Sequence, residues 1–200
     1  MSDNEKFLLE RSKAGDVAAF EILIEAYQKK IFNLAYRIVG NYDDAGDLMQ
    51  EALIRVFKSI ANFKEQSSFS TWVYRITTNV CLDDIRKNKN KNKRVLSLDE
   101  EIHLENGDMK RQIMSDDPLP DEIAEREELR RIVSNAIDSL PEEQRLVITL
   151  RDIQGLSYGE IKEVLNCPSG TVKSKINRAR KALKDVLLKK QELYNAEYVK

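Results

Sequence analysis

The chain has few of the residues that build disulfide frameworks, metal sites and tight turns. Its 200 residues include two cysteines, one histidine, four prolines and seven glycines. Cys81 and Cys167 lie far apart, outside any CxxC pattern and without a neighbouring histidine. This spacing indicates neither a disulfide framework nor a zinc site. We therefore expect both cysteines to be reduced core thiols, and the scarcity of proline and glycine favours a mostly helical chain.

Long apolar segments and catalytic motifs are also absent from the sequence. No stretch is long enough to span a bilayer, and the acidic N-terminus MSDNEKFLLE lacks the apolar run of a signal peptide. The sequence contains no activated nucleophile, no cluster of metal ligands and no glycine-rich phosphate loop. We therefore expect a cytoplasmic protein that is not an enzyme and that carries no cofactor and no metal.

Charge, by contrast, is abundant and unevenly distributed. Apolar residues make up 42% of the chain and charged residues 34%, which suits a globular protein rather than a disordered one. The net charge of -1 conceals two basic clusters, at residues 86–94 and 171–190, with an acidic stretch between them. Local charge is therefore a better guide to binding partners than net charge.

Residues 156–187 have the pattern of two helices joined by a tight turn. Ser157 is suited to cap the first helix, and Glu160 three residues later completes a capping box. Pro168 stops the first helix, because proline cannot donate a backbone hydrogen bond and restricts the residue before it. Ser169 is then placed to cap the second helix. This pattern predicts a helix-turn-helix.

The second helix of this motif has one apolar face and one polar, basic face. Apolar residues recur at spacings of four, three and four, which predicts one buried stripe: Val172, Ile176, Ala179 and Leu183. The opposite face carries small, hydrogen-bonding and cationic residues: Gly170, Ser174, Asn177, Arg178 and Lys181. Such groups can approach a phosphate backbone and reach base edges in a major groove. A lysine-rich helix can also be a solvated surface, but the capped helix before it favours DNA binding.

Four helices are expected in the N-terminal half of the chain. Apolar residues spaced by three or four, together with capping residues, place them at residues 6–15, 17–39, 42–60 and about 71–87. In the last of these helices Trp72 and Ile76 are expected apolar positions, whereas Tyr74 and Thr78 are expected to stay polar or exposed. These helices would form a first domain over residues 1–94.

Aromatic and basic residues flank the last of these helices. The loop NFKEQSSFSTW leads into it, and the run RKNKNKNKR, with six basic residues, ends it. Cations that track phosphates, beside rings on which unpaired bases stack, are what single-stranded nucleic acid binding requires. The basic run can instead be a solvated helix end, and Phe63 and Phe69 can be core residues, as we expect for Trp72.

Residues 95–122 contain one glycine, two prolines, many acidic side chains and no sustained apolar period. This composition predicts an acidic, flexible linker, which either occupies a basic channel as a mimic of nucleic acid or serves as a solubilising tether. Two further helices, at residues 123–139 and 141–155, complete a four-helix domain at 123–190, and residues 191–200 form a short tail. The expected fold is all-α: two small helical domains joined by this linker, the C-terminal one a helix-turn-helix.

Three segments follow one another along the chain: DDAGDLMQEALIRVFKSI, FSTWVYRITTNVCLDDIRK, and LPEEQRLVITLRDIQGLSYGEIKEVLNCPSGTVKSKINRARKAL. In this order they resemble the core-polymerase-binding helix, the downstream-promoter helix and the upstream-promoter domain of the extracytoplasmic-function (ECF) sigma factors of bacterial RNA polymerase. The resemblance implies promoter-specific transcription initiation. It also implies three partners: core RNA polymerase, through its clamp helices and flap, promoter DNA, and an anti-sigma factor, which in this family is often membrane-bound.

The resemblance also assigns roles to individual residues. The core-polymerase-binding positions are Asp47, Gln50, Glu51 and Arg55, with Leu53 and Phe57 expected in the core. The positions for the minus-10 element, where the loop would hold a flipped base, are Phe63, Ser67, Ser68, Phe69, Asn79, Arg86 and Lys87. The positions for the minus-35 element are Ser169, Gly170, Thr171, Lys173, Ser174, Arg178 and Arg180.

Two other functions are compatible with the residues alone. A standalone helix-turn-helix regulator would bind duplex DNA without polymerase, whereas a sigma factor needs polymerase for promoter-specific initiation. An RNA-binding adaptor that uses the aromatic and basic segment would prefer single-stranded RNA over promoter DNA.

Overall fold

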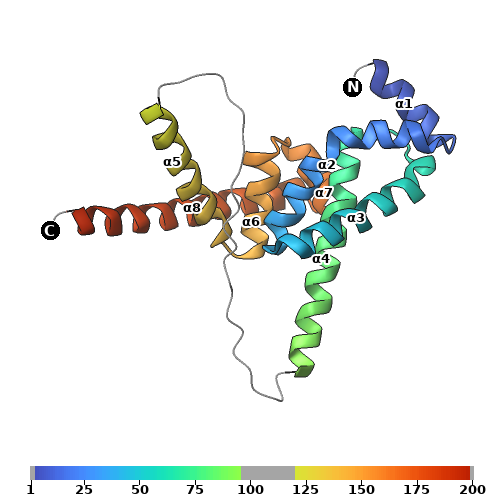
Figure 1. Ribbon diagram of the computed structural model, residues 1–200. Helices are drawn as coiled ribbons and strands as arrows, with labels where there is room; N and C mark the ends of the chain where they lie inside the picture. The colour runs from blue at the N-terminus through green and yellow to red at the C-terminus, as the bar shows by residue number, and fades with distance from the viewer. Residues whose placement is uncertain (1–2, 96–119, 199–200) are drawn as a thin grey trace.

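The computed structural model describes residues 3–95 and 120–198, with the side chains of residues 3–88 and 126–189. Within those ranges all regular structure is helical, and none of the helices combines the length and apolar character that a membrane span requires (Figure 1). The N-terminal half contains α1 (Asp3–Lys13), α2 (Val17–Val39), α3 (Tyr42–Ser59), the 3₁₀ turn η1 (Ile60–Asn62) and α4 (Phe69–Val95). The C-terminal half contains α5 (Pro120–Asp138), α6 (Glu142–Ile148), the π-helical turn η2 (Thr149–Ile153), α7 (Tyr158–Leu165) and α8 (Ser169–Tyr198). The prediction of an all-α fold is confirmed.

Most helix ends lie where the capping residues predicted them. Asp16 precedes α2, and its carboxylate accepts a hydrogen bond from the backbone N–H of Ala19 at 3.0 Å. Gly40 ends α2 with φ of 79°, a left-handed conformation that glycine adopts without strain. The side chain of Asn41 then caps α3 by accepting from two backbone N–H groups. The exception is α4, which is longer than predicted at both ends and continues through the basic run.

The N-terminal half packs around α2, which contacts α1, α3 and α4. Ile31 and Leu34 of α2 are fully buried in this core. An aromatic cluster belongs to the same core: the ring of Trp72 lies 4.9 Å from that of Phe63 and 5.9 Å from that of Phe69. The expectation that Trp72 is a core residue is therefore confirmed.

The C-terminal half packs around the contact between α6 and α8, with α5 and α7 against α8. Its most deeply buried residues come from four successive elements and are at most 1% exposed: Ile148, Leu150, Ile161 and Ile176. Pro141 occupies the N-cap position of α6, where a missing backbone N–H costs little. The helix predicted at this place is thus present, although its last part is the π-helical turn η2.

The two halves contact each other directly. α4 packs against α7, and α2 packs against α6 and η2, so the blue and green helices lie beside the orange ones (Figure 1). The expectation that Tyr74 and Thr78 stay exposed is wrong, because these residues of α4 are 4% and 0% exposed. The physical reason is the contact with the C-terminal half, in which the Tyr74 hydroxyl donates to Oε1 of Gln154 at 3.2 Å.

The two cysteines differ in burial, and this difference is testable. Cys81 is fully buried in the N-terminal core, as expected, whereas Cys167 is partly exposed. Burial raises the pKa of the Cys81 thiol to about 12. Because the thiolate is the reactive form, we expect native Cys81 to react with Ellman's reagent about a thousandfold more slowly than an ordinary cysteine at about pH 8.

The measurement is a count of fast-reacting thiols before and after denaturation. We expect one fast thiol in the native chain and two in guanidinium chloride, since unfolding exposes Cys81. The Cys167→Ser variant should show no fast thiol until it unfolds. A fast native reaction in that variant would contradict the burial of Cys81.

Candidate nucleic-acid interface

The helix-turn-helix is formed by α7, a short turn and α8. The Ser157 hydroxyl accepts from the backbone N–H of Glu160 at 3.2 Å, and the Glu160 carboxylate accepts from the backbone N–H of Ser157 at 2.8 Å. This reciprocal pair is the predicted capping box. At the other end of α7, Asn166 has φ of 46° and ψ of 52°, a left-handed C-cap.

The start of α8 differs in one detail from the prediction. Ser169 was expected to cap the helix but is its first residue. The carbonyl of Pro168 instead accepts from the backbone N–H groups of Thr171 and Val172, at 2.9 and 3.1 Å. The cap position lies one residue earlier because Pro168 already has the φ that precedes a helix and loses no donor there. Ser169 is therefore exposed at the tip of the helix.

The two faces of α8 are separated as the sequence predicts. Val172, Ile176 and Ala179 are all 0% exposed and form the buried stripe. The predicted minus-35 residues lie outside this stripe; Thr171 is partly exposed and the others are exposed: Ser169, Gly170, Lys173, Ser174, Arg178 and Arg180. All seven are therefore accessible on one helix, and we call this set the α8 face.

Ion pairs divide the cations of α8 into two groups. Arg180 is paired with Asp152 of η2 at 2.5 Å, and this hydrogen bond raises the pKa of its guanidinium. Lys175, which the sequence did not single out, is paired with Glu143 of α6 at 2.8 Å. Arg178 bonds instead to the backbone carbonyl of Ser174 on its own helix, at 3.3 Å. To bind DNA, Arg180 must first separate from the Asp152 carboxylate. Arg178 already lies along the exposed surface of the helix.

The residues predicted for the minus-10 element do not all lie on the surface. Phe63 and Phe69 are 6% and 2% exposed, and both rings belong to the aromatic core around Trp72. In this conformation neither ring offers a free face on which a base can stack, so their predicted direct contact is not supported by the geometry. Among the loop residues predicted to contact the minus-10 element, Ser67 is partly exposed and Ser68 is exposed.

Ser68 has a structural role that the sequence analysis did not identify. Its hydroxyl accepts from the backbone N–H of Thr71 at 3.1 Å and lies 2.7 Å from the Thr71 hydroxyl, so it caps the start of α4. The Thr71 hydroxyl in turn donates to Oε1 of Glu160, at 3.0 Å. Hydrogen bonds from Ser157 are the main reason that the pKa of Glu160 is lowered. The loop is thus fixed at the point where the two halves meet.

The remaining minus-10 candidates lie further along α4. Asn79, Arg86 and Lys87 are exposed, and Arg86 forms an ion pair with Asp83 at 3.1 Å. Asn79 follows directly after the buried Thr78, so it points to a different side of the helix from the face that contacts α7. The side chains of the basic run after residue 88 lie outside the described residues.

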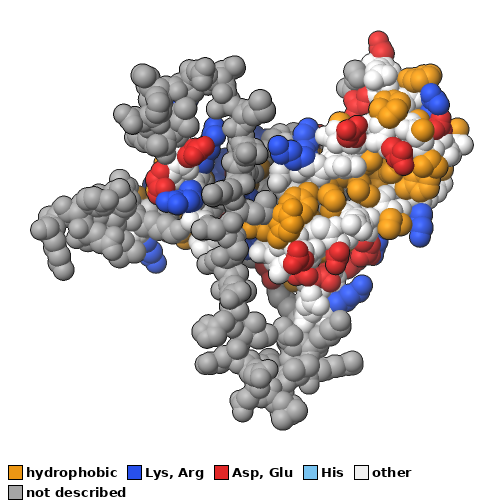
Figure 2. All heavy atoms as spheres, viewed as in Figure 1, with side chains coloured by type: hydrophobic (Ala, Val, Ile, Leu, Met, Phe, Trp, Pro, Cys, Tyr) orange, Lys and Arg blue, Asp and Glu red, His pale blue; other side chains and the backbone are white. Residues whose placement is uncertain are grey.

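The predicted polymerase-binding residues form a surface on α3. Asp47, Gln50, Glu51 and Arg55 are all exposed, and the last two form an ion pair at 2.5 Å. Acidic and hydrophobic side chains lie next to one another over this part of the molecule (Figure 2).

Two apolar residues add to this surface. Ile54, which sequence reasoning missed, is 53% exposed beside Arg55. Phe57 was expected in the core but is 38% exposed, with its ring packed against that of Phe20 at a centroid distance of 5.0 Å. Leu53 is half-buried, as part of the side of α3 that packs against the core. The signal that could have identified Ile54 is an apolar residue that lies outside the periodic stripe, directly before the charged Arg55.

Two known protein families match this chain, one in its N-terminal half and one in its C-terminal half. The family described as Sigma-70 region 2 matches residues 23–91, which include α3 and the exposed part of α4. The family described as Sigma-70, region 4 matches residues 130–183, which include the helix-turn-helix. Each of the two halves therefore matches a separate sigma region.

Similar proteins extend the match over most of the chain. The ECF RNA polymerase sigma factor SigW of Bacillus subtilis is 41% identical over 180 residues, which are 90% of this chain and 94% of SigW. The ECF RNA polymerase sigma-E factor of Escherichia coli K12 is 37% identical over 180 residues, 90% of this chain and 92% of that protein.

Solved structures share the fold. The sigma factor RpoE of Bartonella quintana, in complex with the anti-sigma factor NepR, has a TM-score of 0.66 at 22% identity and covers 86% of this chain and 98% of its own. CnrH, in complex with the cytosolic domain of CnrY, has a TM-score of 0.63 at 23% identity and covers 92% of this chain and 97% of its own. With both sigma regions matched in order and relatives at 37–41% identity over 90% of its length, the chain belongs to the ECF RNA polymerase sigma factors, and its function is promoter-specific transcription initiation.

Proposed function

We propose that this chain acts by binding alone, without catalysis of its own, and that it works in the cytoplasm beside core RNA polymerase. A first domain, residues 1–94, joins the polymerase and recognises the minus-10 element, and a second, residues 123–190, recognises the minus-35 element. The observation that carries this proposal is the α8 face, because all seven minus-35 candidates are accessible on one helix of a helix-turn-helix. A standalone regulator is not favoured, since it would have no use for a Sigma-70 region 2.

The α8 face has the composition of a major-groove reading surface. Gly170 and Ser174 are small and allow the helix to approach the DNA closely, while Lys173 and Arg178 supply cations. In a helix-turn-helix the N-terminal part of the second helix contacts base edges, and phosphate contacts fix its register. We therefore assign base contacts to the first turns of α8. We assign phosphate contacts to the basic residues that follow these turns along the helix.

For the minus-10 element we assign a supporting role to the aromatic core and direct contacts to the residues outside it. The buried rings of Phe63 and Phe69 anchor the loop to the core. Ser67 and Asn79 are accessible to an unpaired base. A flipped base costs a few kcal/mol of lost stacking, which new contacts in the open complex must offset. Arg86 would hold the adjacent phosphate, and Lys87 would act in the same way.

For the polymerase we assign the exposed surface of α3. Its charged residues form polar contacts with the clamp helices, and the exposed Ile54 and Phe57 add apolar area. The C-terminal domain would dock on the polymerase flap. Since the relatives RpoE and CnrH were solved with the anti-sigma factor NepR and the cytosolic domain of CnrY, we also propose an anti-sigma factor as a regulator of this chain.

The experiment that tests the function is run-off transcription with purified core polymerase, with and without this chain, on genomic fragments that include the promoter of its own gene. We expect new, discrete start sites that share upstream sequences. If the chain neither binds core polymerase nor creates a start site, the standalone regulator becomes the better interpretation. Intact core binding with no start site would mean that the tested fragments lack its promoter.

The Arg178→Ala variant separates DNA recognition from polymerase binding. We expect initiation at minus-35-dependent promoters to fall about 10- to 100-fold, because a good cation contact to a base or phosphate is worth about 1–3 kcal/mol. Affinity for core polymerase should not change. The matched control is Lys184→Ala, an exposed cation further along the same helix and outside the α8 face. Equal loss of core binding and promoter use in Arg178→Ala would contradict the assignment.

A further inference from the structure

Lys13, the last residue of α1, lies beside residues 63–68, which we call the minus-10 loop. α1 packs against η1, the turn that leads into this loop (Figure 1). The Lys13 ammonium is paired with the Glu65 carboxylate in the loop and with Oε1 of Glu10 on its own helix, the latter at 3.0 Å. It also lies 5.6 Å from the centre of the Phe63 ring, in a cation–π contact. One side chain of α1 thus contacts two residues of the loop.

The surroundings of Lys13 favour its charged form. Its side chain is 19% exposed, so solvent screens its ion pairs less than those of a fully exposed lysine. It lies at the C-terminal end of α1, where a helix carries partial negative charge. The hydrogen bond between the two side chains raises the pKa of Lys13 and lowers the pKa of Glu65. Both partners are therefore ionised at neutral pH.

Glu65 has a backbone conformation that glutamate rarely adopts. Its φ of 54° lies in the left-handed region, which only Asn166 shares among the non-glycine residues that the structure describes. Asparagine adopts this conformation readily, whereas a longer side chain is strained there because its Cβ comes too close to the following carbonyl oxygen. Such strain persists only where the surroundings hold the residue in place.

The ion pair with Lys13 is the contact that holds Glu65. Between Phe63 and Ser68, a stretch that the structure describes completely, the Glu65 carboxylate is the only group that forms a hydrogen bond or an ion pair with another element. The loop is fixed before this stretch by the buried Phe63 ring and after it by Ser68, which caps α4. The ion pair therefore fixes the middle of the loop, two residues before the accessible Ser67.

We propose that Lys13 is a positioning residue for recognition of the minus-10 element. Its ammonium holds Glu65 in the left-handed conformation and so fixes the course of the loop through Ser67. Lys13 does not touch the DNA in this role, because its ammonium is engaged with two carboxylates and the Phe63 ring. The contact with the loop rests on the geometry alone, whereas its effect on promoter use rests on the proposed function.

The loop contact is tested by limited proteolysis of the full-length chain with trypsin, which cleaves after lysine. Lys64 is exposed directly before Glu65, so the rate of cleavage after Lys64, followed by mass spectrometry, reports how firmly the loop is held. We expect Lys13→Ala to accelerate this cleavage about three- to tenfold, because a partly buried ion pair is lost. The matched control is Lys6→Ala, an exposed lysine of α1 that forms no ion pair in the described part of the chain, and it should change the rate by less than about twofold.

Two substitutions of Glu65 separate the ion pair from the strain that it holds. Glu65→Ala loses the pair and keeps a Cβ, so its cleavage should be about as fast as that of Lys13→Ala. Glu65→Gly also loses the pair but adopts a φ of 54° without strain, so its cleavage should be slower than that of Glu65→Ala. Each rate is normalised to that of a synthetic peptide of the same loop sequence.

The double variant gives the decisive comparison. Lys13→Ala should have no further effect on cleavage in the Glu65→Gly chain, while circular dichroism reports the same helix content for all variants. An equal effect of Lys13→Ala in the parent and Glu65→Gly chains, or no effect in the parent chain, would overturn the contact.

A second arm tests promoter recognition with core polymerase, at a promoter that the run-off assay identifies. A single-base substitution in its minus-10 element should reduce initiation by the parent chain. We expect Lys13→Ala to lessen this penalty about three- to tenfold, because a loosely held site discriminates less between bases. The penalty for a minus-35 substitution and the affinity for core polymerase should not change.

The two arms fail separately. Faster cleavage with an unchanged minus-10 penalty would overturn the positioning role and leave the loop contact intact. Equal loss of discrimination at both promoter elements would also overturn it, since Lys13 would then act on the stability of the whole chain. If the parent chain creates no start site, the proposed function and the minus-10 role are both wrong, while trypsin still decides the loop contact.

Discussion

The Trp72→Ala variant is expected to unfold with about 3–5 kcal/mol less free energy than the parent chain. Trp72 is 7% exposed, and its ring packs against those of Phe63 and Phe69, with centroid distances of 4.9 and 5.9 Å. Alanine would leave a cavity beside these two rings and remove their contacts with Trp72. Because domains of this size are stable by about 5–15 kcal/mol in total, the loss is a large fraction.

The measurement is a urea titration followed by circular dichroism. The control is Phe7→Ala in α1, an aromatic residue that is 59% exposed and contacts Arg11 through its ring. We expect that control to cost no more than about 1 kcal/mol. Equal losses in the two variants would contradict the view that the minus-10 loop rests on a packed aromatic core.

The second large effect is expected for Ile176→Ala, at about 2–5 kcal/mol of unfolding free energy. Ile176 is 0% exposed in the middle of the buried stripe of α8, between Val172 and Ala179. This stripe is what holds α8 against α6 and α7. Its truncation should therefore also reduce promoter-specific initiation, because the α8 face is positioned only while the C-terminal half is folded.

The only tryptophan of the chain makes this variant more informative. Trp72 lies in the N-terminal half, so its fluorescence follows the Ile176→Ala change only if the two halves unfold together. We expect the midpoints by fluorescence and by circular dichroism to shift equally. The control is Leu188→Ala, an apolar residue on the same helix that is 46% exposed and should change stability by about 0.5 kcal/mol or less. If Leu188→Ala lowered the free energy of unfolding as much as Ile176→Ala, the view that the buried stripe stabilises the C-terminal half would be wrong.

Local features of this fold could be predicted from the sequence because their causes are local. The capping box at Ser157 and Glu160 involves residues three positions apart, and the left-handed turn at Gly40 needs only the absence of a Cβ. The apolar stripe of α8 follows from the helical period alone. These features predicted the buried side of α8 before any tertiary contact was known, whereas the residues of the α8 face were taken from the family resemblance.

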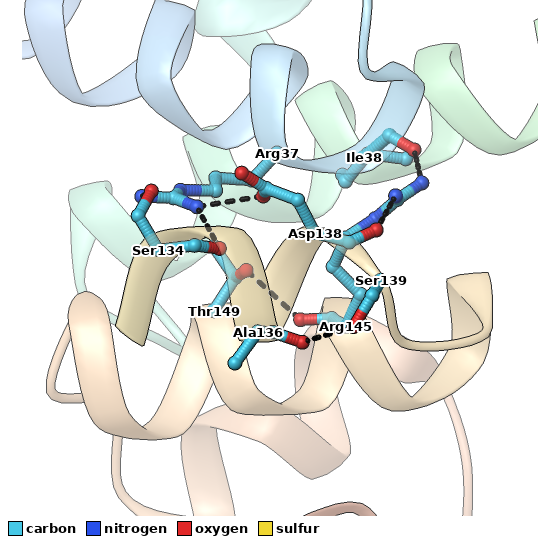
Figure 3. Close-up of polar contacts among 8 residues, drawn as sticks. All are labelled: Arg37, Ile38, Ser134, Ala136, Asp138, Ser139, Arg145 and Thr149. Atoms are coloured by element: carbon cyan, nitrogen blue, oxygen red, sulfur yellow. Dashed lines mark hydrogen bonds and ion pairs between the residues drawn. The ribbon is translucent and has the colours of Figure 1, made fainter. Parts of the chain in front are cut away.

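The errors have a common cause, which is contact between residues far apart in the chain. Tyr74 and Thr78 have polar groups and were expected to stay exposed, but the C-terminal half covers them. Arg37 shows no sequence signal at all, because its partners lie about one hundred residues away, on α5 (Figure 3). Phe57 fits a helical stripe yet remains 38% exposed, although its ring contacts that of Phe20 on α2. Periodicity identifies faces of a helix but not what covers them.

Glu160 places an evolutionary constraint on this protein. The same carboxylate completes the cap of α7 and bonds to Thr71 of the other half. A substitution that removes it weakens the folding of the DNA-reading unit and the contact between the halves together, so selection cannot adjust one without the other. Glutamine would keep an acceptor for only one of the two bonds, because the Thr71 hydroxyl and the Ser157 backbone N–H donate to different carboxylate oxygens. Loss of this one carboxylate is therefore expected to do more damage than loss of a residue that has only one of these two roles.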